Sequence, residues 1–407
     1  MNVEGACVTV DTETLQLQMH ELQADGESDY SPHGKLGVIA MRGCEGIGEV
    51  IDGYLKMFRF DETADFLVKT SCPRFLTGEG KAIIEQTVRG YDIFILCDCY
   101  NYSVTYKMYG EESRMSPDDH YRDLIRTIAA LGGKAKRINV IMPMLYSSRQ
   151  DNKNSRESLD CAISLKELVD MGVSNILTFD AHEPRVQNAI PLSGFDTIRP
   201  SYQMIKALYR NVDDIELTRD KALIVSPDEG AMSKNEYYSS VLDLDIATFY
   251  KRRDYTRVVN GKNPILSFDF LGKDTDVVGK DVIVIDDILA SGDSTLNVVG
   301  QLHKMGAKRI FVFITFGQFA AGTKQFDEAY ENGIINKIFV TNTTYKPKEI
   351  INKPWYCNVD ISKYLATIID SLNLNKSISK LLNPIKKIQS LKEKVETNEK
   401  QEKFIIQ

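Results

Sequence analysis

The feature that most constrains the fold is a repeated alternation of short apolar runs with segments of amphipathic, helical period. Runs such as VIVI at 282–285 and IFVFI at 310–314 lack the period-two pattern of a half-exposed strand, which indicates strands buried on both faces. The amphipathic segments between the runs would cover such strands as helices. We therefore predict the α/β class, with mostly parallel sheets flanked by helices.

Length and turn residues suggest how the chain divides. A chain of 407 residues with 43% hydrophobic residues can bury two cores. The segment PLSGFDTIRP at 191–200 collects turn-forming residues, so we place a domain boundary there. The predicted parts are an N-terminal extension at 1–32, domains at 33–195 and 196–352, a C-terminal helical segment at 353–383 and a charged tail at 384–407. We expect the tail to be a solvated helix or a frayed end.

Composition argues against several classes of protein. The formal net charge of −7 gives no sign of a nucleic-acid-binding surface. No apolar run approaches the roughly 18 residues that span a bilayer, and the first residues lack the basic start and apolar core of a secretory signal. We therefore expect a cytoplasmic protein that binds neither membrane nor nucleic acid. The seven cysteines, including Cys97 and Cys99 of a C-x-C pair, are expected to be reduced.

Two adjacent acids follow a strand that is predicted to be fully buried. Asp286 and Asp287 end the run DVIVIDD, and the small polar segment ASGDST at 290–295 leads into a predicted helix. Ligands of open parallel sheets bind beyond the carboxyl ends of the strands, and the N–H groups at a helix N-terminus favour an anion. Adjacent carboxylates can accept hydrogen bonds from the vicinal hydroxyls of a ribose. The stretch predicts a pentose-phosphate site, although a strand-end turn with an Asp or Ser N-cap has a similar pattern.

A cationic segment follows another predicted strand. Lys251, Arg252 and Arg253 open a loop that also carries Arg257 and Lys262. A solvated hairpin is a common use of such charges. The functional hypothesis is a mobile flap that closes over an anionic group.

Several motifs resemble those of one enzyme family. DVIVIDDILASGDST resembles the phosphoribosyl-pyrophosphate (PRPP) motif of phosphoribosyltransferases and ribose-phosphate pyrophosphokinases. Motifs similar to those of the pyrophosphokinases occur in the family's order: RFLTGEG, MPMLYSSRQDNKNSR, LTFDAHEPRVQ, IVSPDEG, FYKRR and a C-terminal segment beginning PWYCNVDIS. The resemblance covers roughly residues 34–383. It implies two phosphoribosyltransferase-like domains, the first on the ATP side and the second carrying the PRPP loop.

The resemblance also implies a reaction and its partners. The diphosphoryl group of MgATP would move to the 1-hydroxyl of ribose 5-phosphate, giving PRPP and AMP, with Mg²⁺ as the cofactor. The family associates into dimers or larger oligomers such as hexamers, so we expect self-association. One hairpin of the ATP site would then come from a neighbouring subunit.

Roles for individual residues follow from the same resemblance. The residues implied for ribose 5-phosphate are Asp286, Asp287, Ala290, Ser291, Gly292, Asp293 and Ser294. The residues implied for ATP are Phe75, Glu79, Arg149, Gln150 and Asp151, with Phe75 stacking on the adenine. His182 and Asp228 would lie at the metal, where Mg²⁺ prefers oxygen ligands. Lys251 and Arg253 would be the catalytic residues that contact the transferred group.

The chain departs from the family pattern at several positions. Ala290 replaces an acid of the PRPP loop, and Thr77 replaces the aspartate of R-F-S-D-G-E. Ala189 and Ile190 stand where the family has two phenylalanines, and residues 100–115 form an insertion.

These departures leave three hypotheses open. The first, which we favour, is an active but divergent pyrophosphokinase, because Lys251, His182 and both acids of the PRPP motif remain. The second is a non-catalytic regulatory subunit of the same fold, which Ala290 and Thr77 would suit. The third is a phosphoribosyltransferase that uses a nucleobase.

Overall fold

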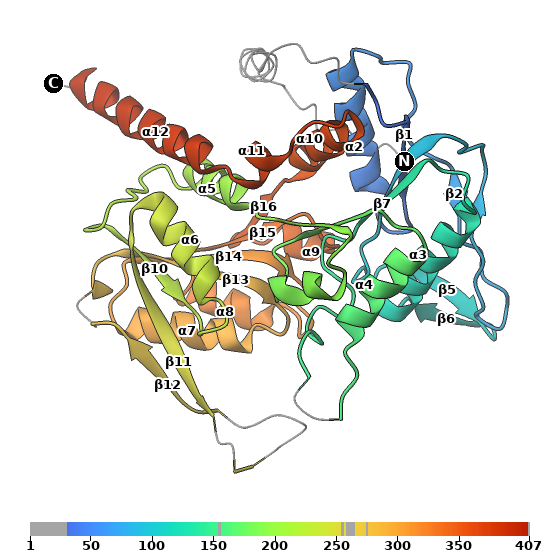
Figure 1. Cartoon of the computed structure of the whole chain (residues 1–407). Helices are drawn as coiled ribbons and strands as arrows, with labels where there is room; N and C mark the ends of the chain where they lie inside the picture. Colours follow the sequence, from blue (N-terminus) through green and yellow to red (C-terminus); the bar gives the residue numbers. More distant parts are fainter. Residues whose placement is uncertain (1–30, 154–155, 254–255, 258–264, 274–275, 406–407) are drawn as a thin grey trace.

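The computed structural model describes residues 31–153, 156–253, 256–257, 265–273 and 276–405, and two sheets form its framework (Figure 1). In the first sheet the strand order is β1-β4-β7-β8-β9, and all neighbours are parallel. Its strands are β1 (Lys35–Ala40), β4 (Tyr91–Leu96), β7 (Arg137–Ile141), β8 (Asn175–Phe179) and β9 (Gly194–Ile198). The parallel arrangement confirms the predicted α/β class.

The second sheet repeats this order and extends it at one edge. Its order is β12-β11-β10-β13-β14-β15-β16, and only the β11–β12 pair is antiparallel. Its strands are β10 (Ala222–Ser226), β11 (Asp245–Arg253), β12 (Ile265–Leu271), β13 (Asp281–Leu289), β14 (Arg309–Gly317), β15 (Lys337–Thr341) and β16 (Tyr356–Val359). The series β10-β13-β14-β15-β16 matches β1-β4-β7-β8-β9 in connectivity, as expected for two domains of similar fold.

Helices cover both sheets. Those linked to the first sheet are α2 (Glu45–Arg59), α3 (Pro117–Leu131), α4 (Asp160–Asp170) and the 3₁₀ helix η1 (Pro184–Ala189). Those linked to the second are α5 (Ser201–Asn211), α6 (Met232–Leu242), α7 (Asp293–Lys304), α8 (Lys324–Glu331) and α9 (Lys348–Ile351), followed by α10 (Ser362–Asn373), α11 (Ser379–Leu382) and α12 (Ile385–Ile405). Within the described ranges, no helix is long and apolar enough to cross a bilayer.

Local sequence explains where α3 begins and ends. The Ser116 side chain accepts a hydrogen bond from Asp119 N–H, and the Asp119 side chain accepts one from Ser116 N–H, which is a capping box. Pro117 occupies the first turn, where its missing N–H is not needed, and Gly132 ends the helix in the left-handed conformation. The apolar face of α3 packs onto the first sheet.

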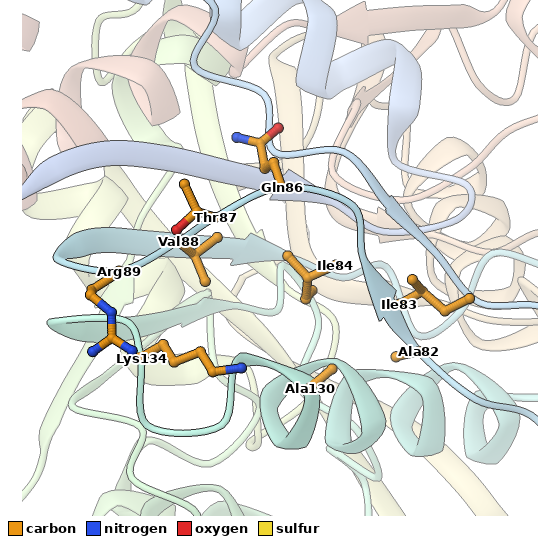
Figure 2. A pocket seen from close by; sticks show the side chains of 9 residues that line it. All are labelled: Ala82, Ile83, Ile84, Gln86, Thr87, Val88, Arg89, Ala130 and Lys134. Carbon is orange, nitrogen blue, oxygen red and sulfur yellow. The ribbon is translucent and has the colours of Figure 1, made fainter.

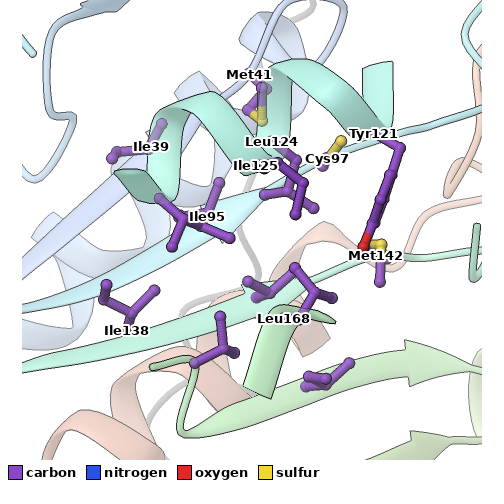
Figure 3. Close-up of a cluster of buried hydrophobic side chains, with 14 of the residues drawn as sticks. Ile39, Met41, Ile95, Cys97, Tyr121, Leu124, Ile125, Ile138, Met142 and Leu168 are labelled. Carbon is purple, nitrogen blue, oxygen red and sulfur yellow. The ribbon is translucent and has the colours of Figure 1, made fainter. Parts of the chain in front are cut away.

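The core of the first half lies between this sheet and the helices α3 and α4 (Figure 3). Ile39 and Ile95 from the strands, Leu124 from α3 and Leu168 from α4 are fully buried there. Truncating any one of them to alanine would cost about 2–5 kcal/mol of unfolding free energy, because a cavity would remain.

The two halves are interlocked by exchanged helices. α10 follows β16 of the second sheet but packs against α2 of the first half, where Arg59 donates to Asp370 and Asn373. α5 follows β9 of the first sheet but packs against β15 and β16. The exchanged helices therefore pack the two halves against each other.

Three details differ from the sequence-based expectations, and the structure also shows what the insertion contains. β9 continues through Ile198, so the predicted boundary at 195 falls inside a paired strand, and the chain changes sheets between β9 and β10. The segment 353–383 was expected to be helical, but it begins with the strand β16. The insertion at 100–115 contains the hairpin β5 (Thr105–Met108) and β6 (Glu111–Arg114). The charged tail starts as the helix α12, whose Ile388 is fully buried against the second half.

Candidate active site

The two halves meet in a direct contact between His182 and Asp287. Nδ1 of His182, which follows β8, donates to Oδ2 of Asp287 on β13 at 2.7 Å. Asp287 is only 6% exposed, whereas His182 is partly open to solvent. The sequence placed both residues at carboxyl ends of strands, and the structure brings those two ends together.

The neighbouring acids Asp286 and Asp287 differ in their electrostatics. Burial opposes the charged form of Asp287, but the Lys234 ammonium and the His182 hydrogen bond hold the pKa of this carboxyl well below its usual range. Burial and the adjacent Asp287 charge raise the pKa of Asp286 well above its usual range. The hydrogen bond to Asp287 raises the pKa of His182. The pair therefore places a carboxyl whose charged form is favoured, Asp287, beside one whose charged form is disfavoured, Asp286.

Lys234 is a site residue that the sequence motifs did not indicate. It lies in the first turn of α6, and its Nζ is 3.8 Å from Asp180 Oδ2 and 3.9 Å from Asp287 Oδ1. Asp180 follows β8, and its Oδ2 accepts a hydrogen bond from Thr315 Oγ1 of β14 at 2.5 Å. The available signal was positional, because Lys234 lies in the first turn of the helix that follows β10, and the carboxyl end of β10 lies at this edge.

Asp228 organises the turn between β10 and α6. Its Oδ1 accepts a hydrogen bond from Ala231 N–H at 3.1 Å, and its backbone carbonyl accepts one from Ser226 Oγ at 2.8 Å. The negative charge of Asp228 also contributes to the raised pKa of Asp286. The predicted metal residue Asp228 therefore lies at the same edge as the two acids.

The predicted phosphate loop joins β13 to α7. Gly292 has a φ of 95°, and a Cβ at this position would overlap the ring of Phe326, so both conformation and space require glycine. Ser291 Oγ donates to Asp293 Oδ2 at 2.9 Å, and the Ala290 carbonyl accepts from Ala320 N–H. These contacts place the loop at the N-terminus of α7.

Ser294 adds an unused polar group at the same helix end. Its hydroxyl oxygen is buried and has no hydrogen-bond partner among the residues that the structure describes. A buried hydroxyl without a partner is costly, and the helix N-terminus beside it favours negative charge. The loop therefore has the composition of an anion site.

The polar loop at 149–151 lies at the same junction. Arg149 Nη2 donates to Oε1 of Gln318, which follows β14, at 2.9 Å. Gln150 Nε2 donates to the Ser158 carbonyl at 2.8 Å. Burial raises the pKa of Asp151, and the charge of the nearby His182 opposes that rise.

The turn that carries Phe75 and Glu79 is exposed and has its own set of contacts, separate from those around Asp287. Phe75 is 55% exposed, and Thr77 Oγ1 donates to Glu79 Oε2 at 2.6 Å. Arg74 pairs with Asp123 of α3 at 2.9 Å. Within the described part of the chain, no hydrogen bond or ion pair joins this turn to the contact between His182 and Asp287.

Lys251 and Arg253 are at the end of β11, in the ribbon that β11 and β12 extend beyond the sheet (Figure 1). Their backbones pair with Phe268 and Ile265 of β12. Their side chains, and most of the loop that follows, including Lys262, lie outside the described residues. Their predicted catalytic role therefore stays a prediction.

Two surface hollows lie elsewhere. One, of about 530 Å³, is lined by residues that include Val88, Arg89 and Lys134 at the amino end of β4 (Figure 2). The other, of about 520 Å³, is lined by residues that include Lys35 and Arg59 at the amino end of β1. Both face the opposite edge of the first sheet from Asp287. Among the described side chains, no group of three or more His, Cys, Asp or Glu residues is arranged to hold a metal ion.

Comparisons with known proteins agree with this geometry. Residues 40–172 match the family profile of the N-terminal domain of ribose phosphate pyrophosphokinase, and residues 269–383 match that of the phosphoribosyl synthetase-associated domain. The ribose-phosphate pyrophosphokinase of Fusobacterium nucleatum is 27% identical over 321 residues, which cover 78% of this chain and 91% of that protein. The enzyme of the same name from Vibrio parahaemolyticus is 26% identical over 318 residues, covering 77% and 90%.

A solved structure shares the fold. The phosphoribosylpyrophosphate synthetase of Mycobacterium smegmatis superposes with a TM-score of 0.68 at 22% identity, covering 84% of this chain and 99% of that one. The two family profiles together span more than half of the chain and lie on either side of the junction. The chain therefore belongs to the ribose-phosphate pyrophosphokinase family.

Proposed function

We propose that the chain transfers the diphosphoryl group of MgATP to the 1-hydroxyl of ribose 5-phosphate, which yields PRPP and AMP. The observation that carries the proposal is the 2.7 Å contact between His182 and Asp287 beside the loop at 290–294. This contact joins an acceptor for the sugar to the other half of the molecule, where the nucleotide loop lies.

The ribose 5-phosphate side uses charge and shape together. The ionised Asp287 is suited to accept hydrogen bonds from the ribose hydroxyls, and Asp286 beside it can donate one when it is protonated. The loop of Ala290, Ser291 and Gly292 with the N-terminus of α7 would receive the 5-phosphate. Ser294 supports this assignment, because its buried hydroxyl would gain a partner.

The ATP side would combine two subunits. Arg149 would bind phosphate oxygens and Gln150 and Asp151 would line the same loop. Phe75 would stack on the adenine of a neighbouring subunit's nucleotide, with Glu79 beside it. The exposed ring and the absence of described bonds from its turn to the site support this shared arrangement, and with it a dimer or a larger oligomer such as a hexamer.

The residues present fit a metal ion that arrives with the nucleotide. Mg²⁺ is usually held by one or two protein ligands together with substrate phosphates, so a complete protein cage is not expected. His182 uses Nδ1 for Asp287, which leaves Nε2 for a ligand in the arrangement common for metal-bound histidines, and Asp228 supplies carboxylate oxygens at the same edge. Bound there, Mg²⁺ would neutralise charge on the phosphoryl oxygens.

Transfer itself requires positioning and charge neutralisation more than covalent chemistry. Lys251 and Arg253 would close over the transferred group from the β11–β12 ribbon. Asp287 would hold the ribose so that its 1-hydroxyl meets the nucleotide in line.

One assay tests the proposal against both alternatives. Purified protein is incubated with MgATP and ribose 5-phosphate, and AMP and PRPP are quantified. Equimolar AMP and PRPP that disappear in the Asp287→Ala variant support the proposal. No product from the isolated protein, with stimulation of a separate active pyrophosphokinase, would identify a regulatory subunit. Consumption of added PRPP with a nucleobase would identify a phosphoribosyltransferase.

A further inference from the structure

The placement of Lys234 suggests a role that the sequence motifs do not assign. Its side chain is 15% exposed, and its ammonium lies between Asp180 from the first half and Asp287 from the second. The two separations, 3.8 and 3.9 Å, are nearly equal. The ammonium thus bridges carboxylates that belong to different sheets.

Lys234 is held by charge and not by hydrogen bonds. At these distances the contacts are ion pairs, and none of the described residues forms a hydrogen bond with the ammonium. An ammonium is strongly hydrated, so burying it without hydrogen bonds is costly. A lysine in this position is therefore better explained by the charges around it than by packing.

Asp180 is also fixed in an unusual way. Its φ of 35° places a non-glycine residue in the left-handed region, where backbone strain is usually tolerated only for a functional or local reason. Thr315 holds its Oδ2 from β14 at 2.5 Å while Lys234 approaches the same oxygen. Asp180 and Asp287 are thus oriented from several sides.

The charge balance explains why such a cation is needed. Asp180, Asp286 and Asp287 lie close to Lys234, and the charge of Lys234 favours the ionised forms of both Asp286 and Asp287. A cluster of carboxylates alone would repel a phosphorylated sugar. The Lys234 ammonium, which lies 3.8 and 3.9 Å from the oxygens of Asp180 and Asp287, would offset that repulsion.

We propose that Lys234 is a positioning residue for the ribose 5-phosphate site. Its ammonium holds the Asp180 and Asp287 carboxylates, one from each half, in the orientation that receives the sugar and balances their charge. This inference rests on the proposed function, because ribose 5-phosphate is taken as the ligand.

Three variants separate positioning from a structural role. Lys234→Met removes the charge and keeps most of the side-chain volume, Lys234→Arg keeps the charge, and Glu236→Gln is a matched control at an exposed position of α6. The measurements are the Kd for ribose 5-phosphate by calorimetry and the steady-state kcat and KM for both substrates. Thermal unfolding of each variant checks the fold, and Lys234→Gln replaces the methionine variant if that one does not fold.

We expect Lys234→Met to raise the Kd and KM for ribose 5-phosphate by about tenfold, which corresponds to about 1.4 kcal/mol, with a smaller change in kcat. The KM for MgATP should stay within about twofold, and Lys234→Arg should recover most of the affinity. If Lys234 only stabilised the fold, the Lys234→Met variant would unfold at a lower temperature, and its KM for ribose 5-phosphate would be unchanged. That result would overturn the inference.

A double variant tests the charge-balance argument itself. Asp180→Asn combined with Lys234→Met removes one acid and one base, so we expect part of the lost affinity to return. Affinity as weak as in Lys234→Met alone, or weaker, would show that the ammonium binds the ligand directly, and positioning would be wrong. Wild-type protein that binds ribose 5-phosphate without forming PRPP would defeat the proposed function but not this inference, whereas no binding at all would defeat both.

Discussion

Asp98 and Asp287 occupy equivalent places in the two halves of the molecule. Each lies six residues after another aspartate, Asp92 or Asp281. Both carboxylate oxygens of that aspartate accept hydrogen bonds from Nε and Nη2 of an arginine on the neighbouring strand. Each also accepts a hydrogen bond from the other half, from the segment that follows β8 or β15, which are the fourth strands of the two matching series. Asp287 meets His182 after β8, and Asp98 Oδ2 accepts from Tyr345 N–H, after β15, at 2.8 Å.

The two equivalent acids have different surroundings. Asp98 is buried, and its oxygens accept backbone N–H groups from Tyr100 and Tyr345. Asp287 instead faces the side chains of His182 and Lys234. The same position in the fold thus supports the junction in one half and the proposed chemistry in the other.

The pair predicts opposite phenotypes for the same substitution. Asp98→Ala leaves two partly buried N–H groups, those of Tyr100 and Tyr345, without their acceptor, so we expect a loss of about 2–4 kcal/mol in the free energy of unfolding, with kcat/KM per folded molecule largely kept. Asp287→Ala should abolish measurable turnover and leave the fold intact, because it removes a ligand contact at the edge. Denaturant unfolding and steady-state kinetics measure both. An Asp287→Ala enzyme with more than about half of the normal kcat/KM, a loss below roughly 0.5 kcal/mol, would contradict the assignment.

Gly292 predicts a second contrast, within the phosphate loop and its helix. Gly292→Ala would strain a left-handed residue and push against Phe326, so we expect weaker ribose 5-phosphate binding together with lower stability. Gly300, in the middle of α7, has open space where a methyl group would be added, and Gly300→Ala should raise stability by about 0.5–1 kcal/mol. Calorimetry with ribose 5-phosphate and thermal unfolding test both variants. Unchanged binding in Gly292→Ala would show that the loop does not receive the sugar phosphate.

Much of the fold was predictable because the central strands are buried on both faces. The runs that became β13 and β14 have no alternation, and their burial follows from the helices on either side. β16 was harder to predict, since YCNV is short and precedes a long helical pattern. The burial of Ile388 depends on packing of α12 against α5 and α6, which a charge-rich sequence does not reveal.

The site was predictable where its residues follow strands. Asp287 and His182 both lie at strand ends, so the rule that ligands bind at the carboxyl edge of a sheet indicated each of them, whereas their contact was seen only in the structure. Lys234 was missed because its role depends on a contact between two halves, and no sequence spacing encodes that contact. The role of Phe75 requires a second subunit and therefore remains a proposal.

Lys346 predicts a pH dependence of stability. Burial lowers the pKa of its ammonium to about 7, while Nζ contacts the carbonyls of Thr341 and Thr344. Because the unfolded chain keeps the higher pKa of an ordinary lysine, it binds more protons than the folded chain above pH 7. The destabilising effect is complete below pH 7 and is relieved as pH rises toward 10, by up to about 1.4 kcal/mol per pH unit.

The test compares wild-type protein with Lys346→Met. Denaturant unfolding between pH 6 and pH 9 should show wild-type stability rising relative to that of the variant, which lacks the titrating group. Two parallel stability curves would show that Lys346 keeps its proton throughout this range.

Lys251 is expected to act mainly on the transition state. Lys251→Ala should lower kcat much more than it weakens ribose 5-phosphate binding, because the flap's charge matters most while the diphosphoryl group is in transit. The strand position of Lys251 at the end of the β11–β12 ribbon suits such a flap. Steady-state kinetics with both substrates measure the split. A sharply raised KM with an unchanged kcat would make Lys251 a substrate anchor instead.

The last prediction concerns the turn of Phe75 and Glu79, which we expect to complete the nucleotide site of a neighbouring subunit. Glu79→Ala and Lys251→Ala should each be inactive alone, because one removes the turn's acceptor and the other removes the flap's charge. Mixed and reassembled, the two variants should recover part of the activity, since some sites would combine an intact turn with an intact flap. Thr77, which donates to Glu79 at 2.6 Å, orients that carboxylate, so Thr77→Val should weaken ATP binding without preventing recovery. Full activity in a protein that sediments as a monomer, or no recovery in confirmed mixed oligomers, would rule out the shared site.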